Sequence, residues 1–175
     1  MIMPTSGHGS SSGIIAENHE ASAALSPKQF ADSERRLLIR LEHYWRSLRQ
    51  STRGPFIEDF RISRNPVPWE DCFIAHVGGS RAELAFDHIG TAIVALFKPD
   101  RTNRTDGEWL MDTIRHRFGD MSQVLKTASP ARGEGRFCRP DGMVVIYRSM
   151  LLPLVDANRE PTYMIGAMTY RLDPA

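Results

Sequence analysis

Three histidines could take part in chemistry, and the residues around each of them decide what that chemistry would be. His76 and His88 fall on two short apolar runs that predict neighbouring strands, whereas His116 falls within a helical pattern. Paired with a carboxylate such as Asp71, either His76 or His88 would form the polar dyad that acid–base catalysis needs. The spacing brings no third ligand to these histidines, so a metal site is not expected.

The rest of the sequence lacks the usual signatures of an enzyme. It contains no G-x-S-x-G nucleophile elbow, no P-loop and no glycine fingerprint for a dinucleotide. Asp87 and His88 are adjacent on a predicted strand, so their side chains would point to opposite faces and could not act as a pair. No catalytic residue is therefore assigned from the sequence.

Composition and charge exclude several classes of partner. The 175 residues include 22 basic and 21 acidic ones, and a net charge of +1 gives no overall footprint for nucleic acid or for anionic lipid. No apolar run approaches the roughly 20 residues of a membrane helix, and the N-terminus lacks a signal-peptide pattern. Cys72 and Cys138 do not make a disulfide framework. We therefore expect a cytoplasmic protein with neither nucleic acid nor membrane as a partner.

Composition also divides the chain into four segments. They are a disordered tail over 1–25, an amphipathic helix over 26–52, a connector over 53–69 and a folded domain over 70–173. The tail is rich in serine, glycine and polar residues, which bury too little apolar surface to order a chain. Prolines and glycines interrupt the connector, for which we expect irregular structure with one short extended piece over 56–62.

The helix over 26–52 has an apolar face whose partner the sequence leaves open. Ser26 can cap the helix, and Pro27 suits its first position. Glu42 is expected on the opposite face, in solvent. The apolar face would pack either on the chain's own domain or on a second copy in a homodimer. In the second case the interface residues would be Leu37, Leu41, Tyr44, Trp45 and Leu48.

The segment from 70 to 173 reads as strands, then helices, then strands. Two apolar runs over 72–77 and 82–89 predict a hairpin, and three short helical patterns follow it. A third strand is expected over 132–138, and a long hairpin over 143–173 closes the domain. Pro153 within this hairpin indicates an edge position, a strand end or a bulge. The predicted fold is α+β, with a five-stranded antiparallel sheet and short helices on one face.

Three pieces of this layout resemble a known family. They are LEHYWRSL at Leu41–Leu48, FDHIGTAIVALF at Phe86–Phe97 and YRSMLLPLVDANREPTYMIGAM at Tyr147–Met168. Their order and spacing resemble the PAS domain, and more narrowly an alphaproteobacterial PAS-like family of small regulatory proteins. The resemblance covers about residues 33–172. It implies a PAS-like sheet and a signalling module that senses a ligand or docks a partner, and it does not imply an enzyme.

The resemblance also implies where a ligand or a cofactor would lie. Some PAS domains hold haem through a histidine on a core helix, so His116 is the haem candidate, although no cofactor is the main expectation. Residues that would line a PAS-like pocket could equally form a closed, ligand-free core. These residues are Phe86, Ile93, Phe97, Trp109, Ile114, Phe118, Ile146, Met150, Ile165 and Met168.

Two functions from different classes remain open. The first is a non-catalytic, cytoplasmic PAS-type sensory or regulatory module that binds a ligand or a protein and forms a homodimer. The alternative is a small α+β enzyme of the cyclase or isomerase type, with a polar dyad in a cone-shaped pocket. A bare adaptor without any ligand is a further possibility. A histidine and a carboxylate in contact inside a pocket would favour the enzyme, and a sealed apolar interior would favour the sensor.

Overall fold

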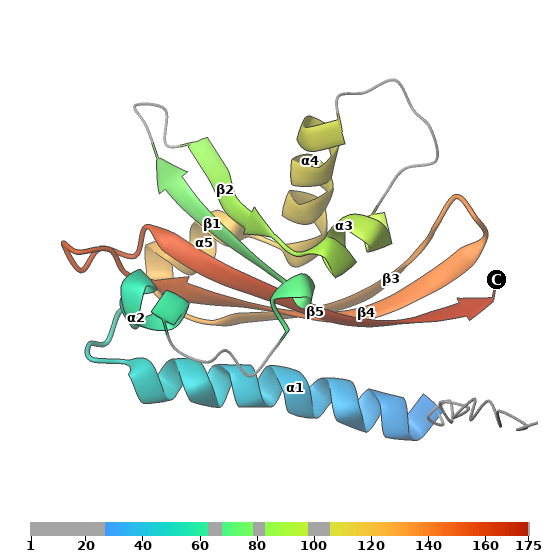
Figure 1. Cartoon of the computed structure of the whole chain (residues 1–175), viewed down its shortest axis with the longest axis horizontal. Helices are drawn as coiled ribbons and strands as arrows, with labels where there is room; N and C mark the ends of the chain where they lie inside the picture. Colours follow the sequence, from blue (N-terminus) through green and yellow to red (C-terminus); the bar gives the residue numbers. More distant parts are fainter. Residues whose placement is uncertain (1–26, 63–67, 79–82, 98–105, 175) are drawn as a thin grey trace, which may run out of the picture.

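The computed structural model describes residues 27–62, 68–78, 83–97 and 106–174 (Figure 1). The tail predicted over 1–25 therefore lies outside the described residues. The elements, in chain order, are α1 (Pro27–Leu48), α2 (Ile57–Ile62), the 3-10 turn η1 (Trp69–Asp71), β1 (Cys72–Gly78), β2 (Glu83–Ile89), α3 (Thr91–Phe97), α4 (Asp106–Phe118), α5 (Met121–Thr127), β3 (Ala131–Cys138), β4 (Met143–Leu154) and β5 (Tyr163–Pro174).

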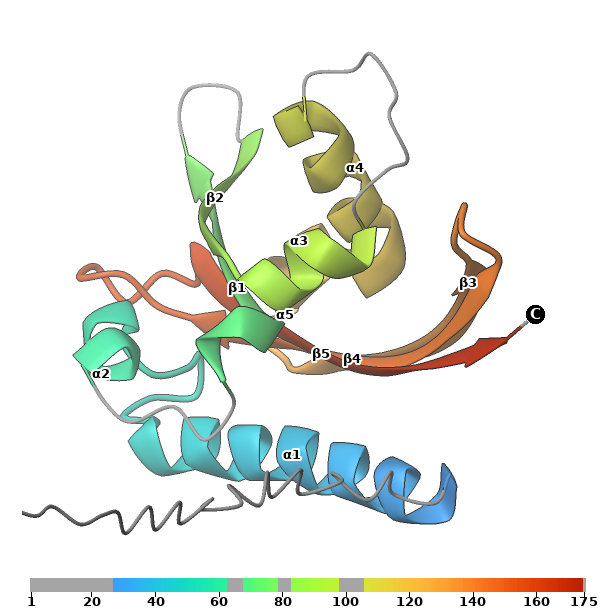
Figure 2. The same ribbon diagram turned by 45° about the vertical axis from the view of Figure 1, so that its right-hand side comes forward.

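The strands form one antiparallel sheet in the order β2-β1-β5-β4-β3. The predicted α+β class with five antiparallel strands is thereby confirmed. Helices α3, α4 and α5 cover one face of the sheet, and the long α1 runs beneath the other face (Figures 1 and 2). The two strands at the edges are β2 and β3, so each of them pairs with one neighbour only.

The sheet has an apolar core on each face. Along β4, Val145, Tyr147 and Leu151 pack against α3, α4 and α5, in what we call the helix-side core. Met150 and Leu152 belong instead to an α1-side core with residues of α1, α2, β1 and β5. Successive strand residues point to opposite faces, so a strand that is covered on both sides reads as a continuous apolar run. This explains why the sequence of β4 shows no clear alternation.

The apolar face of α1 packs on the chain's own sheet. Leu41 and Trp45 are 0% and 1% exposed, and both belong to the α1-side core. The indole Nε1 of Trp45 donates a hydrogen bond of 2.6 Å to the backbone oxygen of Pro153. The sequence left open whether this face packs on the chain's own domain or on a second copy, and in the structure it packs on the chain's own domain.

Pro153 lies in the part of β4 that extends beyond its pairing with β3. The pairing of β3 with β4 extends only to Leu151, whereas β5 pairs with β4 as far as Leu154. Pro153 is thus close to a strand end, as its missing N–H requires. Gly54 in the connector approaches this point at φ +138, and a Cβ there would lie 2.7 Å from the Pro153 oxygen. The connector and the α1–sheet contact therefore meet at one backbone carbonyl.

The extended piece predicted over 56–62 was wrong, because Ile57–Ile62 forms helix α2. Ile57 and Phe60 are three residues apart and are buried together in the α1-side core, as one turn of helix allows. The Phe60 ring meets the Tyr44 ring edge-on, with centroids 5.4 Å apart.

Two glycines allow aromatic rings to lie flat on neighbouring strands. Gly135 of β3 is opposite Tyr147 of β4, and a Cβ at Gly135 would lie 2.8 Å from the Tyr147 hydroxyl oxygen. Gly166 of β5 is opposite Phe73 of β1, and a Cβ there would overlap the phenyl ring. Larger residues at either glycine would displace a core aromatic ring.

Candidate functional site

The ten residues expected to line one pocket do not share a cavity. Six of them, Phe86, Ile93, Phe97, Ile114, Phe118 and Met168, lie in or against the helix-side core. Met150 and Ile165 belong to the α1-side core, and Ile146 lines an open groove on that same face. Strand alternation separates the two sets, since neighbouring positions on β4 and β5 face opposite ways. The side chain of Trp109 lies outside the described residues.

Close aromatic contacts fill the helix-side core. The Phe73 and Phe118 rings meet edge-on with centroids 4.7 Å apart, and Phe97 stacks on Phe137 at 5.5 Å. Ile114 and Met168 are 0% and 1% exposed. Of the two interpretations left open for these residues, the structure matches the closed core.

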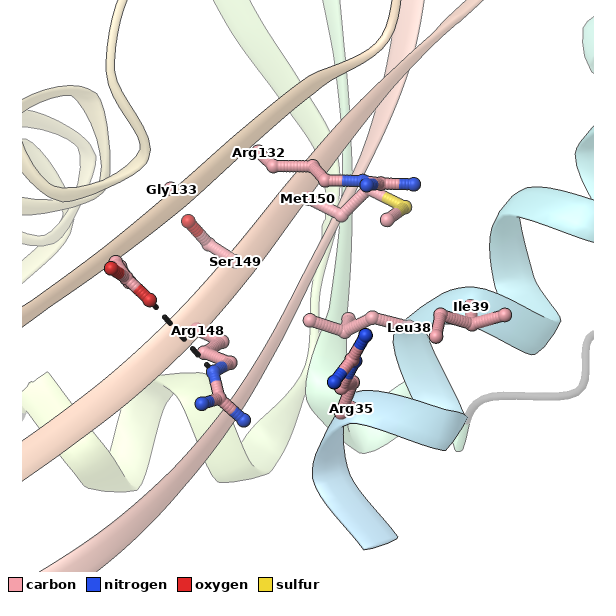
Figure 3. Close-up of a pocket in the computed structure, with 9 residues that line it drawn as sticks. Arg35, Leu38, Ile39, Arg132, Gly133, Arg148, Ser149 and Met150 are labelled. Atoms are coloured by element: carbon pink, nitrogen blue, oxygen red, sulfur yellow. Dashed lines mark ion pairs between the residues drawn. The ribbon is translucent and has the colours of Figure 1, made fainter. Parts of the chain in front are cut away.

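Open space lies instead between α1 and the β3–β4 hairpin. A groove of about 670 Å³ runs there, with α1 on one side and the hairpin on the other (Figure 3). It is lined by Arg35, Leu38, Ile39, Arg132, Gly133, Glu134, Arg148, Ser149 and Met150. A second space of about 450 Å³ shares Glu134 and Arg148 with the first. Its other lining residues are Gly135, Arg136, Ile146, Tyr147 and Arg171. We call these two spaces, which share lining residues, the basic groove.

Positive charge dominates the lining of the basic groove. Its lining contains five arginines and a single acid, Glu134, and three of these arginines are each paired with an acid: Arg132 with Glu42, Arg148 with Glu134 and Arg171 with Asp173. The Nε of Arg148 lies 3.9 Å from Glu134, and Arg171 lies 3.3 Å from Asp173 at the groove's end. Within the described part of the chain, Arg136 takes part in no ion pair. An anion that entered the groove would therefore meet cations that are only partly neutralised.

Glu42 ties α1 to the edge strand at one side of the groove. It is 4% exposed, accepts a hydrogen bond of 2.7 Å from Arg46 one turn along, and accepts a second bond from Arg132 of β3. Burial raises the pKa of the Glu42 carboxyl, but hydrogen bonds and charge from Arg132 and Arg46 outweigh this effect, so the pKa is lowered overall. The expectation that Glu42 faces solvent was wrong.

Strand β5, which contributes Arg171 to the groove, carries buried polar atoms that have no hydrogen-bond partner among the described residues. The Oγ1 of Thr169 and the Nε of Arg171 are both buried and make no hydrogen bond to the described residues. Thr169 is opposite Arg148 in the register of β4 and β5. Buried polar atoms are usually hydrogen-bonded, so two such atoms side by side are unusual.

A histidine–carboxylate pair does form, but elsewhere and with a different acid. The Nδ1 of His76 lies 2.8 Å from Asp87 on the adjacent strand, and both side chains are 29% exposed. A bulge between Ile74 and Ala75 shifts the register and brings Asp87 to this position. The Tyr163 ring is 5.3 Å from the His76 ring. The pair lies on the α1 side of the sheet, because His76 alternates with residues of the helix-side core.

The other candidates for acid–base chemistry are not part of this pair. His88 places its Nε2 3.0 Å from the backbone oxygen of Trp69. Asp71 lies before β1, where burial and then the charge of Glu70 raise its pKa. The expectation that Asp87 and His88 point to opposite faces was wrong, because at this bulge His88 is opposite Ile74 of the α1-side core and Asp87 meets His76 on that same side. The sequence also missed Asp87 as the partner of His76. Only the register of the β1–β2 hairpin, including its bulge, would have identified Asp87 as the partner of His76.

Metal and haem candidates find little support in this arrangement. Among the described residues, no group of three histidines, cysteines, aspartates or glutamates could hold a metal ion. His116 is exposed on α4 and is not among the residues of the helix-side core, where a haem would have to lie. A haem therefore does not fit at His116. None of the helices in the described part of the chain is both long enough and apolar enough to span a membrane.

The chain was compared with known proteins on the basis of its sequence. No family model matches it, and no curated protein matches it.

Proposed function

We propose that the chain is a non-catalytic, PAS-type regulatory module that binds its partner in the basic groove between α1 and the sheet. The position of the open space carries this proposal. The helix-side face is filled by packed aromatic and aliphatic side chains, whereas the groove is open and charged. A module of this kind would signal by a change in the docking of α1 and not by chemistry.

The order of elements supports the PAS-like character of the module. The resemblance implies two strands, a helical segment and three further strands, and the described elements follow this order. Cys72 is buried, Cys138 is exposed, and they do not form a disulfide, which supports the proposed cytoplasmic location.

Helix α1 is suited to report on the occupant of the groove, because it contributes residues both to the groove lining and to the contact that attaches the helix to the sheet. Arg35 and Leu38 line the groove, while Leu41 and Trp45 on the same helix anchor it to the sheet. An occupant that contacts α1 and the hairpin together would favour the docked helix, and one that needs the space beneath it would favour release. A ligand shifts such an equilibrium only through its different affinity for the two states.

Self-association is proposed in a restricted form. Leu41 and Trp45 are used by the chain's own sheet, so a second copy would contact the half-buried residues Leu37, Tyr44 and Leu48. Light scattering on the purified chain measures the mass, and Leu37→Glu should convert a dimer to a monomer. A dimer that persists in this variant would exclude this side of α1 as the interface.

Hydrogen exchange on the full chain tests whether α1 is a movable element. We expect amides of α1 to exchange faster than those of β4 and β5, through an opening that leaves the sheet folded. Glu42→Gln should accelerate exchange in α1 alone, whereas the control Ile114→Val in the helix-side core should not act selectively on α1. Exchange of α1 in step with β5 in every variant would contradict the proposal.

The His76–Asp87 pair is the one observation that favours the enzyme alternative. Neither residue lines the basic groove, and both are partly exposed on the sheet rather than enclosed in a cone-shaped pocket. A general base needs a substrate held within hydrogen-bond reach, so the regulatory function is preferred.

A further inference from the structure

We propose that the basic groove binds an acidic, partly apolar peptide in extended conformation, which adds as a strand to the free edge of β3. The inference rests on the proposed function, since it names the partner class of the same groove. Four observations carry it: the spread of the arginines, the unpaired strand edge, the apolar lining and the buried polar atoms without partners.

The arginines are spread along a line and do not converge on a point. Arg132 and Arg136 are four residues apart on β3, which corresponds to about 13 Å along a strand. Arg171 extends the row sideways, because Arg136 pairs with Ile146 and Ile146 pairs with Arg171. One small anion could not reach all of these guanidinium groups. An extended peptide with carboxylates on every second residue could contact Arg132 and Arg136 on the edge strand, whereas Arg171 lies on β5, two strands further from that edge. The planar guanidinium favours bidentate contact with a carboxylate.

The edge of β3 offers the backbone groups that an added strand would use. In the sheet β3 pairs only with β4, so its outer N–H and C=O groups take no part in strand pairing. Gly133 and Gly135 alternate with the charged residues of β3. Every second side chain of an added strand would therefore lie on the same face as Arg132 and Arg136, toward the groove and α1. Main-chain bonds supply affinity in this mode, and the alternate side chains supply specificity.

The lining distinguishes a peptide from a nucleic acid. Three apolar residues also line the groove, of which Ile39 is half-buried and Leu38 and Met150 are buried, and they favour a partner that carries apolar as well as acidic side chains. Single-stranded nucleic acid needs aromatic platforms for its bases. Tyr147 is the sole aromatic residue among the lining residues, and its hydroxyl donates to the backbone oxygen of Arg117, so its ring is held in the helix-side core.

Two of the buried polar atoms without partners among the described residues lie on β5, on the face of the sheet that carries the groove. The buried Nε of Arg171 is a donor, and the Oγ1 of Thr169 can donate or accept. An acidic side chain of the occupant that reaches across the sheet face to Arg136 and Arg171 would satisfy the Arg171 donor. Without an occupant this buried donor has no partner among the described residues, and that adds to the cost of leaving the groove empty.

Selection from a displayed library of random dodecapeptides on the immobilised full chain tests the proposal. The peptides enriched should alternate acidic with apolar residues, and the best one should bind the full chain in fluorescence anisotropy. Arg136→Glu should weaken this binding about tenfold or more, in line with the cost of removing one partner of a charge pair. The matched control, Lys126→Glu on α5, makes the same change of charge on the opposite face of the sheet and should leave the affinity unchanged.

Two further probes separate strand addition from simple attraction of anions. Proline is placed in turn at the two central positions of the selected peptide, and at one of them at least it should abolish binding, because alternate residues of an added strand donate their N–H groups to β3 and proline has no such donor. Polyphosphate and oligo(dT) should not compete at equal charge. Enrichment of neutral or basic peptides, equal effects of Arg136→Glu and Lys126→Glu, full binding of both proline peptides, or equal competition by either polyanion would each overturn the inference. If α1 still opens independently in hydrogen exchange, the proposed function survives that outcome.

Discussion

Removing the hydrogen bond between Trp45 and Pro153 directly tests how α1 is attached to the sheet. Trp45→Phe keeps an aromatic ring in the α1-side core but removes the indole N–H, which donates at 2.6 Å to a carbonyl in a buried setting. The neighbouring Tyr44 provides a control, because its hydroxyl is buried and has no hydrogen-bond partner among the described residues. Both substitutions remove one polar atom from α1 and leave a phenyl ring.

The expected magnitudes differ in size and in sign. In Trp45→Phe the Pro153 oxygen loses its indole donor, which costs about 1–3 kcal/mol, and the smaller ring leaves a cavity that costs about 1 kcal/mol more. We therefore expect the free energy of unfolding to fall by about 2–4 kcal/mol. In Tyr44→Phe an unsatisfied hydroxyl disappears while the edge-on contact with Phe60 remains. Its stability should be unchanged or should rise by up to about 1 kcal/mol.

Urea unfolding followed by circular dichroism measures both values, and an unchanged m-value shows that the unfolded state is the same. In thermal unfolding, each kcal/mol corresponds to about 2–4 °C for a chain of this length. If the two variants differ by less than about 0.5 kcal/mol, the indole bond does not hold α1 on the sheet. A loss of stability in Tyr44→Phe would mean that its hydroxyl has a partner outside the described residues.

Two other predictions concern single residues that join the elements. Glu42→Gln should lower the free energy of unfolding by about 1–2 kcal/mol at pH 7 in urea titrations, a modest value because both arginine partners are well exposed. Since the pKa of Glu42 is lowered in the fold, the difference from the natural chain should begin to shrink as the pH falls through about 4.3, the ordinary value for a glutamate, and should vanish only below the lowered pKa of the folded chain; a constant difference would exclude the ion pairs. Gly54→Ala should cost about 2–4 kcal/mol, because its φ is +138 and a Cβ would clash with the Pro153 oxygen. The control Gly119→Ala has φ +87 and open space around it, so its cost in the same titrations should be about 1 kcal/mol, and equal costs would refute the clash.

Much of the fold could be predicted because local signals agree with it. The helix expected over 26–52 is observed as Pro27–Leu48, and the long closing hairpin is observed as β4 and β5. Capping residues, prolines and turn residues mark where these elements begin and end, and each such signal depends on only a few neighbouring residues. The prediction of an extended piece over 56–62 was wrong because the six residues of α2 are too few to show the 3.6-residue hydrophobic period of a helix.

The candidate site could not be predicted in the same way, because its parts are distant in the chain. Glu42 meets Arg132 across 90 positions, so the helix alone gives no reason for a buried carboxylate. Ile146 and Met150 were assigned to the wrong set because β4 is apolar on both faces and its alternation is hidden. One signal was available: in Arg132–Arg136 a charged residue occupies every second position, which on a strand places all three charges on one face.

The doubly covered strand β4 raises a question of registration during folding. From Met150 to Leu154 all of its residues are apolar and buried, so a slip of one position would exchange apolar groups for apolar groups and meet little resistance there. The alignment must be fixed elsewhere, and the close fit of Tyr147 on Gly135 is suited to fix β4 against β3, as the fit of Phe73 on Gly166 is suited to fix β5 against β1. Two absent side chains would thus decide how each of the longest strands meets its outer neighbour, and a misaligned sheet would be penalised at these two rings before anywhere else.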